Sequence, residues 1–185
     1  MRGEDAVSAD RLRLILNYTP ETGLLTWLNR PIEMFTSHKG FKVWNGKNAG
    51  KEAFTSINLQ GYKQGSIKPH VFLAHRVVWA IHYGAWPDHW IDHINTDKTD
   101  NRICNLRPCT ASQNGMNRNR QGNNTSGFKG VSFYKLRAKW EANICVDGAK
   151  KRLGYFATKE EAAKAYDMAS EIGHAEFCRN NGVGK

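Results

Sequence analysis

The sequence predicts an α+β fold made of two small domains, and three observations carry this prediction. Short segments with strand-like alternation are mixed with helical segments along the whole chain. A polar, basic stretch rich in Gly and Asn, residues 117–126, interrupts them and is expected to be a linker. Three strand-like segments and one helix follow it. The chain has 185 residues, of which 40% are hydrophobic, so its length suits one domain or two small ones.

The part before the linker combines two helices with short strands. Pro20 to Gly23 are expected to form a turn before the first strand, and Gly84 with Pro87 ends the second helix. Residues 30–50 are rich in Gly, Asn and Lys and are expected to form a long loop or an irregular hairpin. The expected elements are a helix at 9–17, strands at 24–28, 62–67 and 70–73, and a helix at 74–83.

A compact unit of two extended segments and a helix start comes next. Thr110 with Gln113 three residues later has the pattern of a capping box, which places Asn114 in the first turn of a helix. The preceding segments are a strand at 90–94, a polar loop at 95–102 and a second extended piece at 105–109.

Beyond the linker, three strands and a helix are expected. Asp147 and Gly148 are a hairpin-turn signal between the second and third strands. Thr158 with Glu161 forms another capping box, and small side chains on the helix would let it pack closely on the sheet. The strands are expected at 129–134, 139–146 and 151–156, and the helix at 159–172.

The charge of the chain points to a polyanionic partner. Lys and Arg total 27 against 17 Asp and Glu, which gives a formal net charge of +10. Nine basic residues but only two acidic ones lie between Gly115 and Phe156, and aromatic residues alternate with them. A charge run is usually a solvated surface, but this strand-like alternation favours a face that binds nucleic acid.

Other classes of protein are excluded by composition. No apolar stretch reaches the roughly 18–20 residues that span a bilayer. The N-terminus has early acidic residues and no long apolar segment, so no secretory signal is expected. The four cysteines have no CxxC spacing, which argues against a disulfide framework or a structural zinc site. A cytoplasmic protein is therefore expected.

Asp92 and His93 are the first candidates for chemistry. Adjacent strand residues point to opposite faces, so a shared site requires distorted backbone at the strand end. The carboxylate of Asp92 and the amide of Asn114 would supply hard oxygen ligands, which suit Mg²⁺ or Mn²⁺. The imidazole of His93 ordinarily titrates near neutrality, as a general base requires. The residue types alone leave open that His93 is a packed or surface histidine.

A pattern of fixed residue types extends from Asp92 to Asn114: DHIN-x-D-x-x-DNR-x-x-NLR-x-x-T-x-x-QN. It closely resembles the HNH motif of His-Me finger endonucleases of the phage and intron-encoded homing type. The preceding segment AHRVVWAIHYGAWP, residues 74–87, is similar to the usual lead-in of that group. The resemblance implies an HNH nuclease domain at residues 1–116, with a ββα-metal core at about 88–118.

Roles for several residues follow from this resemblance. His93 matches the general base that activates water, and Asn105 matches the middle Asn, which braces the loop and orients the histidine. Asp92 and Asn114 match the ligands of one divalent metal per active site, Mg²⁺ or Mn²⁺, although the name-giving motif ends in His. Candidate phosphate contacts are His75, Arg76, Arg102 and Arg107; for His75 and Arg76, packing at a helix start is an equal alternative.

The C-terminal part contains SGFKGV, KWEA, LGYF and EEAAKAYD in that order, and it resembles an AP2 DNA-binding domain. The resemblance implies a βββα domain at residues 127–181 whose exposed sheet face enters the major groove. Several matching positions differ from the plant relatives, so base specificity does not transfer. Five aromatic or apolar residues are expected in its core: Trp140, Leu153, Tyr155, Phe156 and Tyr166. The DNA contacts expected in this domain and its linker are Arg118, Arg120, Lys129, Ser132, Tyr134, Arg137, Lys139, Asn143, Lys150 and Arg152.

Together the resemblances imply a DNA endonuclease that uses a divalent metal to hydrolyse phosphodiester bonds, by nicking or by double-strand cutting. The second domain is expected to target this nuclease to its DNA site. The expected partner is double-stranded DNA bound by a monomer, with no membrane and no small-molecule cofactor, in the cytoplasm of a bacterium or a phage-infected host cell. Two alternatives stay open. One is a DNA-binding regulator with a non-catalytic HNH scaffold, and the other is a less specific, toxin-like nuclease.

Overall fold

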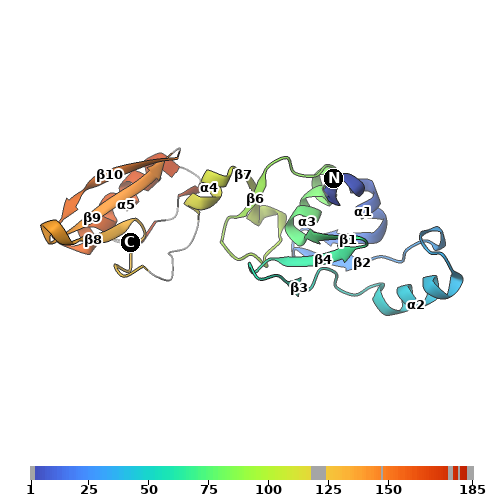
Figure 1. Cartoon of the computed structure of the whole chain (residues 1–185). Coiled ribbons are helices and arrows are strands. Elements are labelled where there is room, and N and C mark those ends of the chain that lie inside the picture. Colours follow the sequence, from blue (N-terminus) through green and yellow to red (C-terminus); the bar gives the residue numbers. More distant parts are fainter. Residues whose placement is uncertain (1–2, 118–123, 147, 175–176, 179, 183–185) are drawn as a thin grey trace. The chain divides into compact units, whose positions relative to one another are not determined.

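The chain forms two compact units, Met1–Pro108 and Cys109–Lys185, in a computed structural model (Figure 1). The structure describes residues 3–117, 124–146, 148–174, 177–178 and 180–182. The division between the units lies before the linker expected at 117–126, so the helix expected around Asn114 is grouped with the second unit. None of the helices in the described ranges is long and apolar enough to cross a membrane.

The first unit begins with a helix and a hairpin. Ser8 caps the helix, because its hydroxyl accepts a hydrogen bond from the backbone N–H of Arg11 at 3.2 Å. The helix was expected to reach Asn17 but ends at Ile15, because Leu16 turns into an extended strand that pairs with Trp27. The elements are η1 (Gly3–Ala6), α1 (Ala9–Ile15), β1 (Leu16–Thr19) and β2 (Leu24–Trp27).

Residues 30–50 contain a helix where a loop was expected, so that expectation was wrong. After the short turn η2 (Ile32–Met34), α2 (His38–Asn48) begins at Ser37, whose hydroxyl accepts from the backbone N–H of Gly40 at 3.1 Å. Trp44 of this helix packs against Trp27, with ring centroids 5.5 Å apart, and Phe41 packs against Phe35. These contacts offset the poor helix propensity of the two glycines in the helix.

A three-stranded antiparallel sheet and a helix complete the core of this unit. The sheet order is β3-β4-β5, and α3 follows β5 directly. In Figure 1, α1 and α3 lie side by side, and Leu12, Val77 and Val78 between them are fully buried. Gly84 ends α3 in the left-handed conformation, as expected. The bounds are β3 (Ser56–Ile57), β4 (Lys63–Ile67), β5 (His70–Leu73) and α3 (Ala74–Tyr83).

The segment after α3 has the expected order of strand, polar loop, strand and helix. β6 pairs with β7, and the backbone N–H of Ile94 donates to the carbonyl of Asn105 at 2.9 Å. The capping box of Thr110 and Gln113 is present, which confirms that prediction. The bounds are β6 (Trp90–His93), η3 (Ile103–Asn105), β7 (Leu106–Cys109) and α4 (Ala111–Met116).

The second unit contains an antiparallel sheet of order β10-β9-β8 with α5 packed on one face (Figure 1). Ala162, Ala163 and Tyr166 of α5 are buried, as is Ala142 of β9. The capping box of Thr158 and Glu161 is also present. Asp147 of the expected hairpin turn lies outside the described residues. The bounds are β8 (Val131–Tyr134), η4 (Lys135–Arg137), β9 (Lys139–Val146), β10 (Ala149–Phe156) and α5 (Lys159–His174).

Candidate active site

Asp92 and His93 close the strand β6, and both side chains are buried. Arg107 of β7 donates from Nε and Nη2 to the same oxygen, Oδ2 of Asp92, at 2.9 and 2.8 Å. The guanidinium of Arg107 was expected to contact phosphate. It instead forms a buried ion pair with the carboxylate of Asp92 on the neighbouring strand β6. Removing one partner of such a buried pair strongly destabilises the protein, so Arg107 fixes the position of the Asp92 carboxylate.

His93 has a hydrogen-bond partner that the sequence did not reveal. Its Nε2 lies 3.1 Å from Oδ1 of Asn101, which is only 2% exposed. An amide oxygen can only accept, so this contact is a hydrogen bond in the tautomer that carries the hydrogen on Nε2 and the lone pair on Nδ1. Asn101 thereby selects the tautomer in which Nδ1 of His93 is the proton acceptor.

Two further aromatic side chains surround His93. The ring centroid of His75 lies 5.1 Å from that of His93, and the centroid of Tyr62 lies 5.8 Å from it. Burial lowers the pKa of His93, an effect that the Asn101 hydrogen bond and the Asp92 charge partly oppose. Burial, together with the neighbouring His93 and Arg76, lowers the pKa of His75 to about 3. Both imidazoles are therefore neutral near pH 7.

The burial of His75 favours the alternative of packing at the helix start, and it leads to a stability prediction. Its folded-state pKa of about 3 lies below the ordinary 6.5, so its contribution to stability is complete above pH 6.5 and is lost as pH falls towards 3. At pH 5 we expect this loss to be about 2 kcal/mol. Urea unfolding at pH 7 and pH 5 measures the free energy of unfolding at each pH. Between the two pH values, His75→Phe should lose about 2 kcal/mol less of this free energy than wild type, and an equal loss in both proteins would contradict the prediction.

Asn105 braces the polar loop that follows His93. Its Oδ1 accepts from the backbone N–H of Asn95 at 2.9 Å, and its Nδ2 donates to Oδ1 of Asn95 and to the carbonyl of Asp100 at 3.0 and 2.8 Å. Within the same loop, Asp97 accepts from the backbone N–H and the hydroxyl of Thr99. The side chain of Asn105 thus contacts the loop, whereas Asn101 contacts the histidine.

Arg76 and Arg102, the two remaining candidate phosphate contacts, both have protein partners. Arg76 pairs with Glu4 through Nε and Nη2 and also donates to the carbonyls of Pro87 and His89. These contacts favour the structural role at the helix start, which was the alternative to a phosphate contact for Arg76. Arg102 donates from Nε and Nη2 to Asp100 at 2.8 and 2.7 Å, and this pair lowers the pKa of Asp100 to about 2.

The β1–β2 hairpin supports the Asn101 segment from the other side. The hydroxyl of Tyr18 donates to the carbonyl of Asn101 at 3.0 Å, and its burial raises the pKa of Tyr18 to about 12. A Cβ at Gly23 would lie 2.5 Å from the backbone nitrogen of Arg102. The close approach of the hairpin to the loop therefore requires glycine at position 23.

Gly23 and Gly50 form a matched pair that tests this contact. Their φ angles are +74° and +75°, but nothing lies within 4 Å of a Cβ at Gly50. We expect Gly50→Ala to cost about 1 kcal/mol, the conformational term alone. Gly23→Ala should cost about 3 kcal/mol because the loop must also move, and it should slow cleavage. Urea unfolding followed by tryptophan fluorescence measures both, and equal costs would show that the loop contact is unimportant.

Asn114 lies on α4 of the second unit, where its backbone N–H donates to the carbonyl of Thr110 at 3.0 Å. The described residues contain no group of three or more His, Cys, Asp and Glu side chains arranged to hold a metal. Asp92 of the first unit offers a buried carboxylate, and the side chain of Asn114 in the second unit offers an amide oxygen. Each is an oxygen donor of the kind that a hard divalent cation takes together with water and phosphate.

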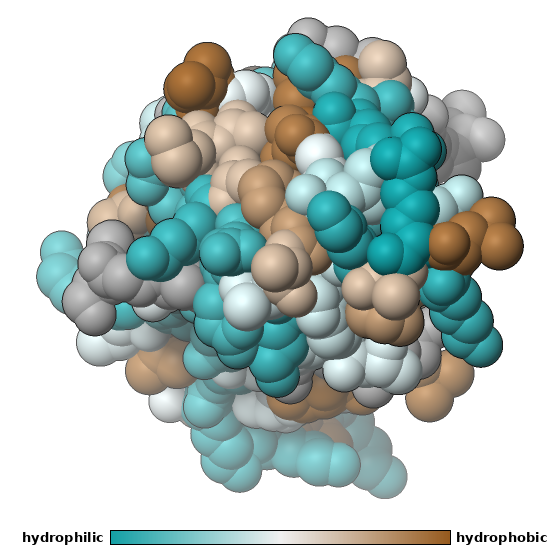
Figure 2. All heavy atoms as spheres, turned by 90° about the vertical axis from the view of Figure 1, so that its left-hand side faces the viewer, coloured by the Kyte–Doolittle hydropathy of each residue, from teal (hydrophilic) through white to brown (hydrophobic). Residues whose placement is uncertain are grey.

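The outer face of the second unit's sheet carries most of the expected DNA contacts. Val131, Ala142 and Ile144 are buried on the face that meets α5. By strand alternation and register, the opposite face carries Ser132, Tyr134, Lys139, Asn143, Lys150 and Arg152. Figure 2 shows hydrophilic side chains beside paler and hydrophobic ones on the face that is turned to the viewer.

Tyr155, Lys129 and two linker arginines complete the expected residues of this unit. Tyr155 was expected in the core, but it pairs with Glu141 on the outer face, and the guanidinium of Arg137 lies 4.7 Å from its ring centroid. The bulge in β10 between Arg152 and Gly154 changes the alternation and explains this error. The ammonium of Lys129, an expected DNA contact, donates to the carbonyl of Met116. Arg118 and Arg120 lie outside the described residues.

Comparison with known proteins matches the central segment to one family. A family model described as HNH endonuclease matches residues 72–116. Protein 3.8 of Escherichia phage T7 is 30% identical over 121 residues, which are 65% of this chain and 97% of that protein. The uncharacterized HNH endonuclease L560 of Acanthamoeba polyphaga mimivirus is 27% identical over 123 residues, 66% of this chain and 61% of the relative.

A solved structure and a plant protein extend the comparison. The structure of DNA binding and cleavage by the HNH homing endonuclease I-HmuI has a TM-score of 0.38 and 20% identity, over 86% of this chain and 85% of that one. APETALA2-like protein 2 of Oryza sativa is 41% identical over 46 residues, 25% of this chain and 11% of the plant protein.

Proposed function

Because the chain belongs to the HNH endonuclease family and acts on the phosphodiester bonds of DNA, we propose that it hydrolyses them with His93 as the general base. The observation that carries this proposal is the hydrogen bond between Nε2 of His93 and Oδ1 of Asn101. It leaves Nδ1 as the basic nitrogen of a neutral imidazole, which is the form that accepts a proton from water.

The proposed reaction is an in-line displacement at phosphorus. His93 takes a proton from water at Nδ1 while the water oxygen forms a bond to phosphorus. The bond from phosphorus to the 3′-oxygen breaks, and that oxygen is protonated by solvent. Asn101 then stabilises the imidazolium, because its Oδ1 continues to accept from Nε2. Asn105 keeps the loop between His93 and Asn101 in one conformation.

Asp92 would be one ligand of a single divalent metal, Mg²⁺ or Mn²⁺, and the resemblance of the sequence motif proposes Asn114 as the other. A metal bound there would neutralise phosphate charge and stabilise the leaving oxygen. Arg107 supports this role indirectly, because it fixes the Asp92 carboxylate from the strand beside it.

The second unit is proposed to hold the DNA through the outer face of its sheet. Two lysines of this face, Lys139 and Lys150, are exposed and come from adjacent strands. Phosphate contacts of this kind dominate affinity, while fewer base contacts set the register on the duplex. The similarity to a short segment of plant APETALA2-like proteins supports an AP2-type mode of binding.

Asn101 is proposed to be a positioning residue, and its substitution separates orientation from binding. We expect Asn101→Ala to lower kcat about 100-fold with little change in KM, because the imidazole loses its fixed tautomer and orientation. Asn101→Asp keeps an oxygen acceptor for Nε2 and should recover most of the lost kcat. Steady-state cleavage of a labelled duplex measures both parameters. A rise in KM with constant kcat would assign Asn101 to DNA binding instead.

Plasmid cleavage tests the proposed function as a whole. Supercoiled DNA incubated with the protein and Mg²⁺ or Mn²⁺ should become nicked or linear, and EDTA should prevent this. The alternative function is that of a DNA-binding regulator with a non-catalytic HNH scaffold. Binding of the plasmid without any cleavage would favour this alternative. A product map on a labelled duplex distinguishes nicking from double-strand cutting.

A further inference from the structure

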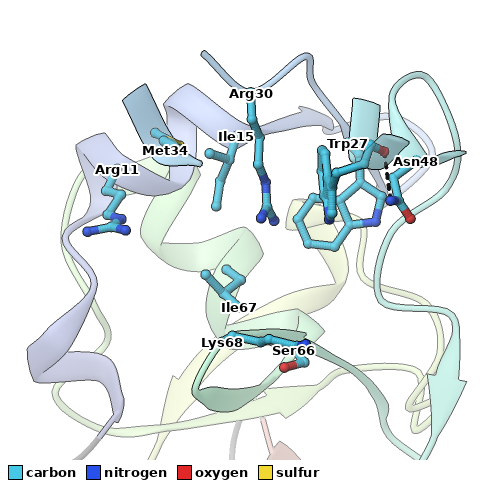
Figure 3. A pocket seen from close by; sticks show the side chains of 10 residues that line it. Arg11, Ile15, Trp27, Arg30, Met34, Asn48, Ser66, Ile67 and Lys68 are labelled. Atoms are coloured by element: carbon cyan, nitrogen blue, oxygen red, sulfur yellow. Dashed lines mark hydrogen bonds between the residues drawn. The ribbon is translucent and has the colours of Figure 1, made fainter. Parts of the chain in front are cut away.

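A pocket lies in the first unit, and none of its lining residues belongs to the candidate active site. It has a volume of about 410 Å³, which is within the range of sites that hold small molecules. Its walls come from α1, β2, α2 and the end of β4 (Figure 3). Ser66 of its wall is four residues beyond Tyr62, or roughly 13 Å along a strand, and none of the active-site side chains lines it.

Arg30 is the central side chain of this pocket. In Figure 3 it points into the cavity between Ile15 and Trp27, opposite Ile67. Asn45 clamps its backbone, because the amide of Asn45 accepts from the N–H of Arg30 and donates to its carbonyl, both at 2.9 Å. The structure therefore holds this arginine in place instead of leaving it as a free surface side chain.

The guanidinium of Arg30 lies over two indole rings, and its Nε–H has no acceptor among the residues that the structure describes. Its Cζ lies 3.7 Å from the ring centroid of Trp44 and 4.9 Å from that of Trp27. Stacking occupies the faces of the guanidinium and not its N–H groups, which lie in the plane. Its buried Nε has no hydrogen-bond partner in the described part of the chain. A buried charged donor without an acceptor is costly, so an acceptor from outside the protein would stabilise it.

Two more cations line the same cavity. Arg11 comes from α1, and Lys68 comes from the turn after β4, as Figure 3 shows. No carboxylate is among the described residues that line the pocket, and none of these three cations has an ion-pair partner in the described ranges. Burial, together with the charge of Arg11, lowers the pKa of Arg30, which is the sign of an uncompensated cation.

We propose that this pocket binds the phosphate group of a nucleotide. An arginine fork flanked by a second arginine and a lysine matches the charge and the oxygen geometry of phosphate. The indole of Trp27 and the side chain of Ile15 offer apolar surface for the sugar or base beside it. The phosphate would belong either to the DNA backbone or to a free nucleotide, and both sources share this chemistry.

Binding measurements on the full chain in EDTA test the proposal without any cleavage. Arg30→Met keeps an apolar chain over Trp44 but removes the guanidinium, and Lys68→Gln removes an exposed charge with little effect on packing. Lys39→Gln is the matched control, since it removes one exposed charge from α2 outside the pocket. Thermal unfolding of each variant verifies that it is folded. The probes are inorganic phosphate and dAMP, by calorimetry, and a duplex, by fluorescence anisotropy over a range of salt.

Two results would support the proposal and one would overturn it. If the phosphate belongs to DNA, Arg30→Met should weaken duplex binding about tenfold and reduce the salt slope by about one. If it belongs to a free nucleotide, wild type should bind dAMP and Arg30→Met should not, with the duplex slope unchanged. The proposal is wrong if Arg30→Met and Lys68→Gln bind all three probes as Lys39→Gln does. Because no probe is cleaved, these outcomes are independent of the role of His93.

Discussion

His93→Ala should lower the rate of DNA cleavage about 1,000-fold while leaving DNA affinity close to that of wild type. The loss is large because the imidazole supplies the only proposed proton acceptor for the attacking water. The affinity is retained because His93 is buried and the proposed phosphate contacts lie on other side chains. Single-turnover cleavage and anisotropy on one labelled duplex measure the two quantities.

His89 provides the matched control for this experiment. It is an exposed histidine four residues earlier in the chain, and only its carbonyl has a described contact, with Arg76. His89→Ala should cleave at the wild-type rate. A His93→Ala variant that cleaves as fast as His89→Ala would remove His93 from the reaction and would make its bond to Asn101 purely structural.

Removing two charges from the outer sheet face of the second unit should weaken DNA binding without changing the rate of the cleavage step. Lys139→Gln combined with Lys150→Gln should weaken duplex binding about 30-fold at 0.15 M salt and reduce the salt slope by about two, as expected for two phosphate contacts. Because affinity for any sequence depends on such contacts, the loss should be similar on specific and random duplexes.

The control removes the same charge from the helix on the other face of this sheet. Lys159 and Lys164 belong to α5, and Lys159→Gln combined with Lys164→Gln should change the salt slope by less than one. If both double variants lose affinity equally, the net charge of the unit matters and the sheet face has no special role.

Local patterns in the sequence predicted much of the fold. The helix at Ala74–Tyr83 and the strand at Lys139–Val146 have the expected bounds, and both capping boxes are present. Each of these depends on a few neighbouring residues, such as an N-cap, a glycine stop or strict alternation. These local features predict the structure correctly because no distant contact opposes them in the folded protein.

The errors occur where distant contacts decide the structure. Helix α2 contains Gly40 and Gly46, and what stabilises it is the packing of Trp44 against Trp27, which is 17 residues away in the sequence. The placement of Tyr155 depends on a bulge whose position requires the register of two strands. Neither feature leaves a periodic signal in the local sequence.

The same distinction applies to the candidate active site. The resemblance to the HNH motif pointed to Asp92, His93 and Asn105, but it did not show what the acidic side chains of the loop contact. Asp97 accepts from Thr99, and Asp100 accepts from Arg102 and Asn95. The Asn of the DNR triplet, Asn101, was the available signal for the partner of His93, but only the folded loop brings its amide to the imidazole.

The central claim is that the first unit cleaves DNA through His93 and the second unit binds it through its sheet. The most direct test is the single-turnover cleavage rate at saturating protein concentration. At saturation, we expect the Lys139→Gln and Lys150→Gln double variant to recover the wild-type rate, because its only defect is affinity. His93→Ala should remain about 1,000-fold slower under the same conditions. A sheet variant that stays slow when all the DNA is bound, or a His93→Ala variant that reaches the wild-type rate, would contradict this division.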